Sequence, residues 1–175
     1  MKKVLFAIPL ALALTGCGSD IDLVKGGVME FNQTTTLGKA LDNWESCESR
    51  EWEEFETDNG IKVVQFTCQH KISQYMSKAK SLLSEEKQAK AKHLDIASNI
   101  QTFQFTINQG DTFQIDNVQV KTTWQDGTSF EDSQNPVEQL ETAYANNLNF
   151  DPAELNEMGA AQISYVFSMI KMRAK

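Results

Sequence analysis

The chain has 175 residues, with 24 acidic against 16 basic residues and a formal net charge of −8 at pH 7. That length suits one domain and is enough to bury a hydrophobic core. The acidic composition excludes nucleic acid as a partner and excludes a polybasic grip on anionic lipid, because both need clustered lysine and arginine.

The first residues form a leader with a positive start and an apolar run. Lys2 and Lys3 precede eleven apolar residues, 4–14, whereas a helix needs roughly 20 to span a bilayer. Small residues then lead to a cysteine, which is typical of the end of a secretory signal. This end, Leu14-Thr15-Gly16-Cys17, resembles the lipobox of bacterial lipoproteins, and the alternative is an ordinary secretory signal with a chance cysteine.

The resemblance implies a lipid anchor at Cys17. In that family the cysteine thiol receives a diacylglycerol, the chain is cleaved after the residue at the position of Gly16, and the new amine of the cysteine usually receives a fatty acyl chain such as palmitate. Two or three chains hold a protein on a bilayer, since each buried methylene contributes about 0.8 kcal/mol. An Asp after the cysteine retains Gram-negative lipoproteins in the inner membrane, so Gly18 implies an outer-membrane anchor facing the periplasm.

Cleavage would remove residues 1–16 as a signal peptide and leave 159 residues, with 14 basic and 24 acidic residues and a net charge of −10. We expect residues 17–25 to be a short lipidated tether. Residues 26–175 should then form one globular domain close to the membrane.

Cys47 and Cys68 are the two cysteines that remain in the domain. In an oxidising compartment such a pair is best explained as one disulfide. Closing a loop of about 20 residues would stabilise the fold by roughly 3 kcal/mol on the chain-entropy model. A catalytic thiol or a metal pair is the alternative, but no C-x-x-C motif or matching histidine motif supports it.

The first predicted elements are a helix over residues 36–45 and a hairpin of strands over 50–57 and 61–68. Threonine hydroxyls precede the helix and suit its N-cap. Asn59-Gly60 is a strong signal for a two-residue hairpin turn.

A two-residue turn would place Phe55 opposite Val64 and Glu51 opposite Cys68. Cys68 then lies on the face that Val64 and Phe66 bury. Since Cys47 falls at the end of the helix, the disulfide is expected to join the helix to the hairpin rather than to link two strands.

The remaining elements follow from hydrophobic periodicity and turn signals. We expect a long helix over 71–95 that frays or breaks at Ser84, strands around 103–107 and 113–120 with a bulge near Asp116-Asn117, and a turn at 125–127 before a strand over 128–131. A helix capped by Asn135, a short helix from Pro152 to about Gly159, and a last strand over 163–172, with a helix as the alternative, complete the chain. The sum is an α+β domain, an antiparallel sheet of hairpins with helices packed on one face.

Catalytic and metal motifs are not evident. His70 and His93 lie 23 residues apart without ligand spacing, so both are expected to be surface histidines. No G-x-S-x-G or supported S-x-x-K motif occurs. The protein is therefore not expected to be an enzyme or to hold a metal or cofactor.

Charge is distributed unevenly along the chain. Residues 42–58 contain eight acids and one base, whereas residues 71–92 contain six lysines and two acids. The acidic run includes Glu51, Glu53, Glu54 and Glu56, on a strand. The plain interpretation is a solvated face that also resists aggregation; the alternative is an acidic edge that binds a cationic partner.

The preferred function is a non-catalytic binding or accessory lipoprotein of the envelope, held to the bilayer by Cys17 and offering a surface to a protein partner. An immunity or inhibitor lipoprotein that blocks a toxin or lytic enzyme is the first alternative. An enzyme acting on envelope polymers is the second.

Overall fold

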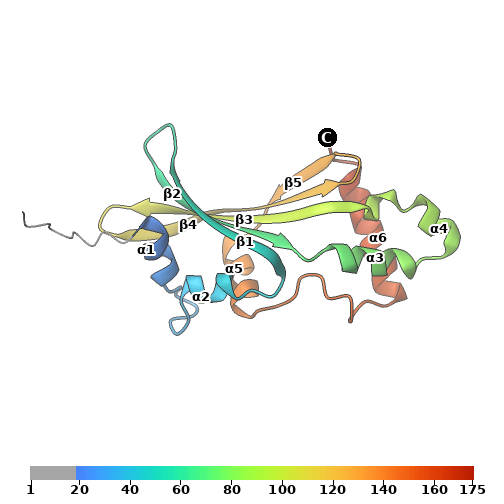
Figure 1. Cartoon of the computed structure of the whole chain (residues 1–175), viewed down its shortest axis with the longest axis horizontal. Helices are drawn as coiled ribbons and strands as arrows, with labels where there is room; N and C mark the ends of the chain where they lie inside the picture. The colour runs from blue at the N-terminus through green and yellow to red at the C-terminus, as the bar shows by residue number, and fades with distance from the viewer. Residues whose placement is uncertain (1–18) are drawn as a thin grey trace, which may run out of the picture.

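Figure 1 shows the computed structural model of the chain, which describes residues 19–175. Five strands form one antiparallel sheet in the order β1-β2-β3-β4-β5, so each strand pairs with its neighbours in the sequence. The strands are β1 (Cys47–Glu56), β2 (Lys62–His70), β3 (Ile96–Asn108), β4 (Thr112–Trp124) and β5 (Ser129–Ser133). The helices are α1 (Asp20–Gly26), α2 (Leu37–Asp42), α3 (Ser73–Ser81), α4 (Glu85–Lys90), the 3-10 helix η1 (Lys92–Leu94), α5 (Pro136–Tyr144) and α6 (Glu157–Lys171).

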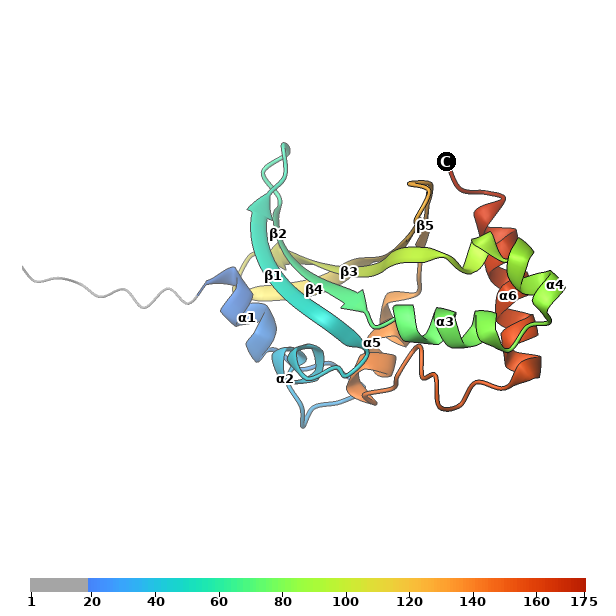
Figure 2. The same cartoon turned by 45° about the vertical axis from the view of Figure 1, so that its right-hand side comes forward.

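The fold is therefore α+β, as predicted. Helices α1, α2 and α5 lie against one face of the sheet, while α3, α4 and α6 gather at the end of the sheet far from α1 (Figures 1 and 2). The predicted signal peptide, residues 1–16, and the lipidation site Cys17 lie outside the described residues.

The sheet has an apolar face and a polar face. In β3 the side chains of Gln101, Phe103 and Phe105 are buried, and those of Thr102 and Gln104 between them are half-buried. Successive side chains of a strand point to opposite faces, so this alternation places the helices against the face of the phenylalanines.

Two groups of buried side chains form the core. One lies around Trp44, Phe66 and Phe103. The other lies around Trp124 and Phe167, where α3 and α6 pack on the end of the sheet. Each of these large side chains stabilises the fold by about 1.5–3 kcal/mol when buried.

The predicted hairpin is present, but its predicted register was wrong by one residue. Phe55 pairs with Val63 and Glu51 with Thr67. Gly60 has a left-handed backbone, with φ of 77°, and its N–H donates to the carbonyl of Thr57 over 2.8 Å. The loop is therefore three residues long with one left-handed glycine, a hairpin type that shifts the pairing relative to a two-residue turn.

The C-terminal segment is a helix, so the predicted strand over 163–172 was wrong and its helical alternative is confirmed. Asn156 caps α6 by accepting the N–H of Gly159 over 2.9 Å. The short helix expected from Pro152 is also absent from the structure, because Pro152 and Ala153 form a turn and the helix begins only at Glu157. Apolar residues occur on both faces of α6, and this concealed its helical period.

The tether was also predicted wrongly in part. Asp20–Gly26 form α1, which Ser19 caps with a capping box. Val24 of this helix is fully buried. The folded domain therefore begins at α1 rather than at residue 26.

Other sequence predictions are confirmed. Thr36 caps α2 by accepting the N–H of Lys39 over 3.2 Å. The helical pattern breaks at Ser84, between α3 and α4. The register of β3 and β4 shifts at Asp116, where the bulge was expected.

Candidate functional site

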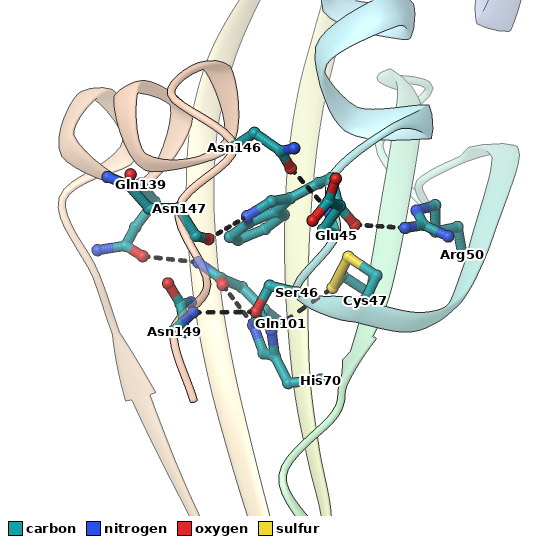
Figure 3. The surroundings of a disulfide bond; sticks show 12 residues. Glu45, Ser46, Cys47, Arg50, His70, Gln101, Gln139, Asn146, Asn147 and Asn149 are labelled. Atoms are coloured by element: carbon teal, nitrogen blue, oxygen red, sulfur yellow. Dashed lines mark hydrogen bonds between the residues drawn. A yellow bond between two sulfur atoms is a disulfide. The ribbon is translucent and has the colours of Figure 1, made fainter. Parts of the chain in front are cut away.

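The disulfide links Cys47, the first residue of β1, to Cys68 in β2, with the Cα atoms 5.3 Å apart (Figure 3). The predicted pairing is thus present in the structure. The expectation that it joins helix to hairpin was wrong, because β1 begins earlier than expected and Cys47 already pairs with His70 in the ladder. The bond cross-links two adjacent strands.

His70 ends β2 and is only 2% exposed, so the prediction of a surface histidine was wrong. Its Nε2 lies 2.8 Å from Oε1 of Gln101, and its Nδ1 lies 2.8 Å from Oγ of Ser46. The amide nitrogen of Gln101 donates to Gln139 over 2.9 Å. The carbonyl oxygen of Gln101 therefore accepts from Nε2–H, and the Ser46 hydroxyl donates to Nδ1. Burial lowers the pKa of His70, which favours this neutral ring.

Ser46 connects three segments of the chain (Figure 3). Its hydroxyl bonds to His70 and also accepts the N–H of Asn149 over 3.3 Å. Its carbonyl accepts the N–H of Lys71 over 3.0 Å. The loop before β1, the end of β2 and the segment after α5 are thus held at one residue.

Two further hydrogen bonds hold the segment after α5. Asn146 has a left-handed backbone, with φ of 53°, at the end of α5. Its side-chain oxygen accepts the N–H of Glu45 over 2.7 Å. The indole of Trp44 donates to the carbonyl of Asn147 over 2.9 Å, so the segment is fixed against the loop before β1.

A pocket of about 450 Å³ lies between these three segments. Its walls are Glu45, Ser46 and Glu48 from the first segment, Lys71, Ser73 and Gln74 from the second, and Leu148, Phe150 and Pro152 from the third. Two carboxylates and one ammonium group therefore lie around an apolar wall. Binding pockets commonly combine apolar walls with a few polar groups, at volumes of roughly 300–1,000 Å³.

A β-bulge directs Glu48 into this pocket. Cys47 pairs with His70 and Ser49 pairs with Gln69, so Glu48 is an extra residue in β1. Bulges occur next to functional sites because they turn a side chain out of the regular alternation. Glu48 is exposed and lines the pocket.

The predicted acidic edge lies on β1, which is an edge strand of the sheet. All four carboxylates, Glu51, Glu53, Glu54 and Glu56, are exposed. Strand alternation places Glu51 and Glu53 on the polar face and Glu54 and Glu56 on the other. Glu54 accepts the N–H of Ile21 in α1 over 3.2 Å. The four residues therefore do not form one row.

Glu53 also ends a ladder of side-chain hydrogen bonds across the polar face. Asn117 donates to Gln104 over 3.2 Å, Gln104 donates to Gln65 over 2.8 Å, and Gln65 donates to Glu53 over 2.5 Å. Gln104 and Gln65 each accept on one side and donate on the other. Glu53 is thus partly engaged within the sheet.

The lysine-rich segment, residues 71–92, and His93 lie mostly at the end of the sheet where α6 packs. Lys80 pairs with Asp95 over 2.6 Å, and His93 is half-buried with Nε2 2.7 Å from Oγ of Ser164. Lys71 differs from the other lysines of the segment because it lines the pocket.

The family model of the prokaryotic membrane lipoprotein lipid attachment site matches residues 1–17, ending at Cys17. The chain is a membrane-anchored lipoprotein of the cell envelope. No curated protein and no solved structure matches it.

Within residues 19–175, no helix of the lipoprotein combines the length and apolar character needed to cross a membrane. The same residues contain no group of three or more His, Cys, Asp or Glu side chains placed to hold a metal ion.

Proposed function

We propose that this lipoprotein is a non-catalytic accessory protein that binds a protein partner through the pocket beside the disulfide. The observation that carries the proposal is that Ser46 fixes all three walls of the pocket. A pocket whose walls are already fixed loses little conformational entropy when it binds. The anchor supports action at a membrane, and Gly18 supports the periplasmic leaflet of the outer membrane.

The pocket suits a peptide segment with a cationic side chain beside an apolar one. Glu45 and Glu48 offer carboxylates, and Leu148, at 44% exposed, offers apolar surface next to Phe150. Lys71 adds a donor for a carbonyl or carboxylate of the same segment. Charge-assisted hydrogen bonds of this kind are about twice as strong as neutral ones.

The Ser46–His70 pair suits a structural role in the pocket wall better than a catalytic role. The partner of Nε2 in this chain of hydrogen bonds is the amide of Gln101, which cannot stabilise an imidazolium as a carboxylate does. Ser46 is 3% exposed, and its hydroxyl is engaged both as donor and as acceptor. The pair is therefore assigned a structural role.

The test is capture of the partner from detergent-solubilised envelopes with the tagged, lipidated protein. Glu45→Gln together with Glu48→Gln should weaken capture by about a hundredfold or more, because each of the two lost charge-assisted contacts is worth roughly 1.5–3 kcal/mol. Glu54→Gln together with Glu56→Gln is the matched control, since it removes the same charge outside the pocket lining. Equal capture by both double variants contradicts the proposal.

The exposed carboxylates of the pocket also favour the inhibitor alternative, because they suit a cationic cleft of an enzyme. Assaying a captured hydrolase with and without the lipoprotein separates the two. Loss of its activity identifies an inhibitor, and unchanged activity identifies an accessory protein.

A further inference from the structure

Helix α6 is apolar on its outer face as well as on its inner face. Ala160 and Phe167 are buried against the core, whereas Met158, Tyr165 and Met172 are 82%, 67% and 72% exposed. Met169 on the same side is 46% exposed. Surface helices normally direct charged and polar residues outward, so an apolar outer face indicates a surface that becomes covered.

The outer residues are spaced symmetrically about Tyr165. Ala161 and Met169 lie four residues before and after it, and Met158 and Met172 lie seven residues before and after it. Steps of three and four residues keep all five side chains on one stripe of the helix. A stripe with this symmetry matches itself when a second copy is turned by a two-fold rotation at Tyr165, as an isologous interface requires.

The side-chain sizes fit the same rotation. It places Met158 of one copy at the level of Met172 of the other, and the small Ala161 at the level of the large Met169. Small against large is the pattern by which facing layers interdigitate. Methionine side chains also adapt readily to an irregular partner surface.

The charges of α6 favour an antiparallel pair. Glu157 begins the helix, and Arg173, whose guanidinium lies over the ring of Phe130, follows its other end. Lys171, the last residue of the helix, already pairs with Asp126 of its own chain over 2.7 Å, so Arg173 is the basic group that faces a second copy. In the antiparallel arrangement Glu157 of one copy is level with the basic end of the other, and the helix dipoles oppose one another. A parallel pair would bring like charges together.

The position of α6 leaves the anchored end free. Helix α1, which follows the anchor, lies at the end of the molecule opposite α6 (Figures 1 and 2). One pair of helices of this length buries less than the roughly 1,600 Å² of a standard interface, so the contact is weak for proteins free in solution. The lipid anchor offsets this because confinement to one membrane raises the effective concentration.

We propose that α6 is a homodimerisation surface, on which a second copy of this lipoprotein binds through its own α6 in antiparallel orientation about Tyr165. This proposal is independent of the pocket and of its partner, since the pocket lining includes no residue of α6.

Cysteine cross-linking of the full, lipidated protein in its native membranes tests the proposal. Cys47 and Cys68 are joined and Cys17 carries lipid, so an introduced cysteine is the thiol that reacts with a short bis-maleimide. Tyr165→Cys should give a cross-linked homodimer. Met158→Cys alone should not, because the two copies of position 158 are about 21 Å apart at 1.5 Å per residue.

Pairs of differently tagged chains fix the orientation. Met158→Cys on one chain should cross-link to Met172→Cys on the other, and Ala161→Cys to Met169→Cys, which repeats the measurement at a second layer without changing Tyr165. Lys121, an exposed residue of β4, provides the control, and the Lys121→Cys variant should stay monomeric. The proposal would be overturned if none of these homodimers formed, or if the only adducts were with a different protein. It would also be overturned if Met158→Cys cross-linked to itself, as in a parallel pair.

Discussion

The side chain of His70 shows how one buried residue links stability to the pocket. It accepts from Ser46, donates to Gln101, and is 2% exposed, so the ring has both hydrogen bonds only when neutral. The same Ser46 fixes the pocket walls. Protonation of the ring would leave Nδ1–H facing a hydroxyl that must reorient, and the hydrogen-bond partners of His70 among residues 19–175 include no carboxylate.

Stability should therefore fall as the pH falls. Burial lowers the pKa of His70 from 6.5 in the folded chain, so the unfolded chain binds the proton more tightly. The stabilisation is complete above about pH 6.5 and is lost as the pH drops toward the folded pKa, by at most about 1.4 kcal/mol per pH unit. Urea unfolding between pH 7.5 and 5 measures this slope. His70→Gln should flatten it.

His93→Gln is the matched control for this measurement. Burial also lowers the pKa of His93, but that side chain is only half-buried. The flattening should therefore be smaller in His93→Gln. A slope in His70→Gln as steep as in the unchanged protein would contradict the assigned network.

Local sequence signals predicted some elements well and others poorly. Thr36, Asn135 and the bulge at Asp116 carry their signals within a few residues, and the structure confirms them. The hairpin register depends on whether one or two turn residues adopt a left-handed backbone. Asn59-Gly60 is compatible with either turn, and in the structure Gly60 alone is left-handed. In α6 the outer apolar stripe masked the helical period.

The pocket was not predictable because three distant segments form it. Residues 45–48, 71–74 and 148–152 meet only in the folded chain. One signal for His70 was present, since it continues the alternation of the buried Val64, Phe66 and Cys68. Following that alternation two residues further would have predicted a buried histidine.

The disulfide joins the paired strands β1 and β2. It closes a loop with a sequence separation of 21 residues beside the bulge at Glu48. Cys47→Ala together with Cys68→Ala should lower the free energy of unfolding by about 3 kcal/mol, chiefly because the unfolded chain gains freedom. Chemical denaturation measures the difference, and a reducing agent should affect the unchanged protein alone. Identical midpoints for both proteins would show that the bond does not stabilise the fold.

Across the whole molecule, the two surfaces proposed to bind partners are separated along its length. The segment that follows the anchor lies at one end, α6 lies at the other, and the start of α3, which lines the pocket, lies between them (Figure 2). A partner in the pocket and a second copy on α6 therefore contact different surfaces. This arrangement is compatible with the proposed role of holding a partner at the membrane.

The most direct test of the binding role is a photo-reactive amino acid at Leu148, on the exposed apolar wall of the pocket, in intact cells. We expect one cross-linked protein adduct, which Glu45→Gln with Glu48→Gln should greatly reduce. The same photo-reactive residue at Lys121, exposed on β4, should not give that adduct. No adduct from Leu148, or the same adduct from both positions, would contradict binding through the pocket.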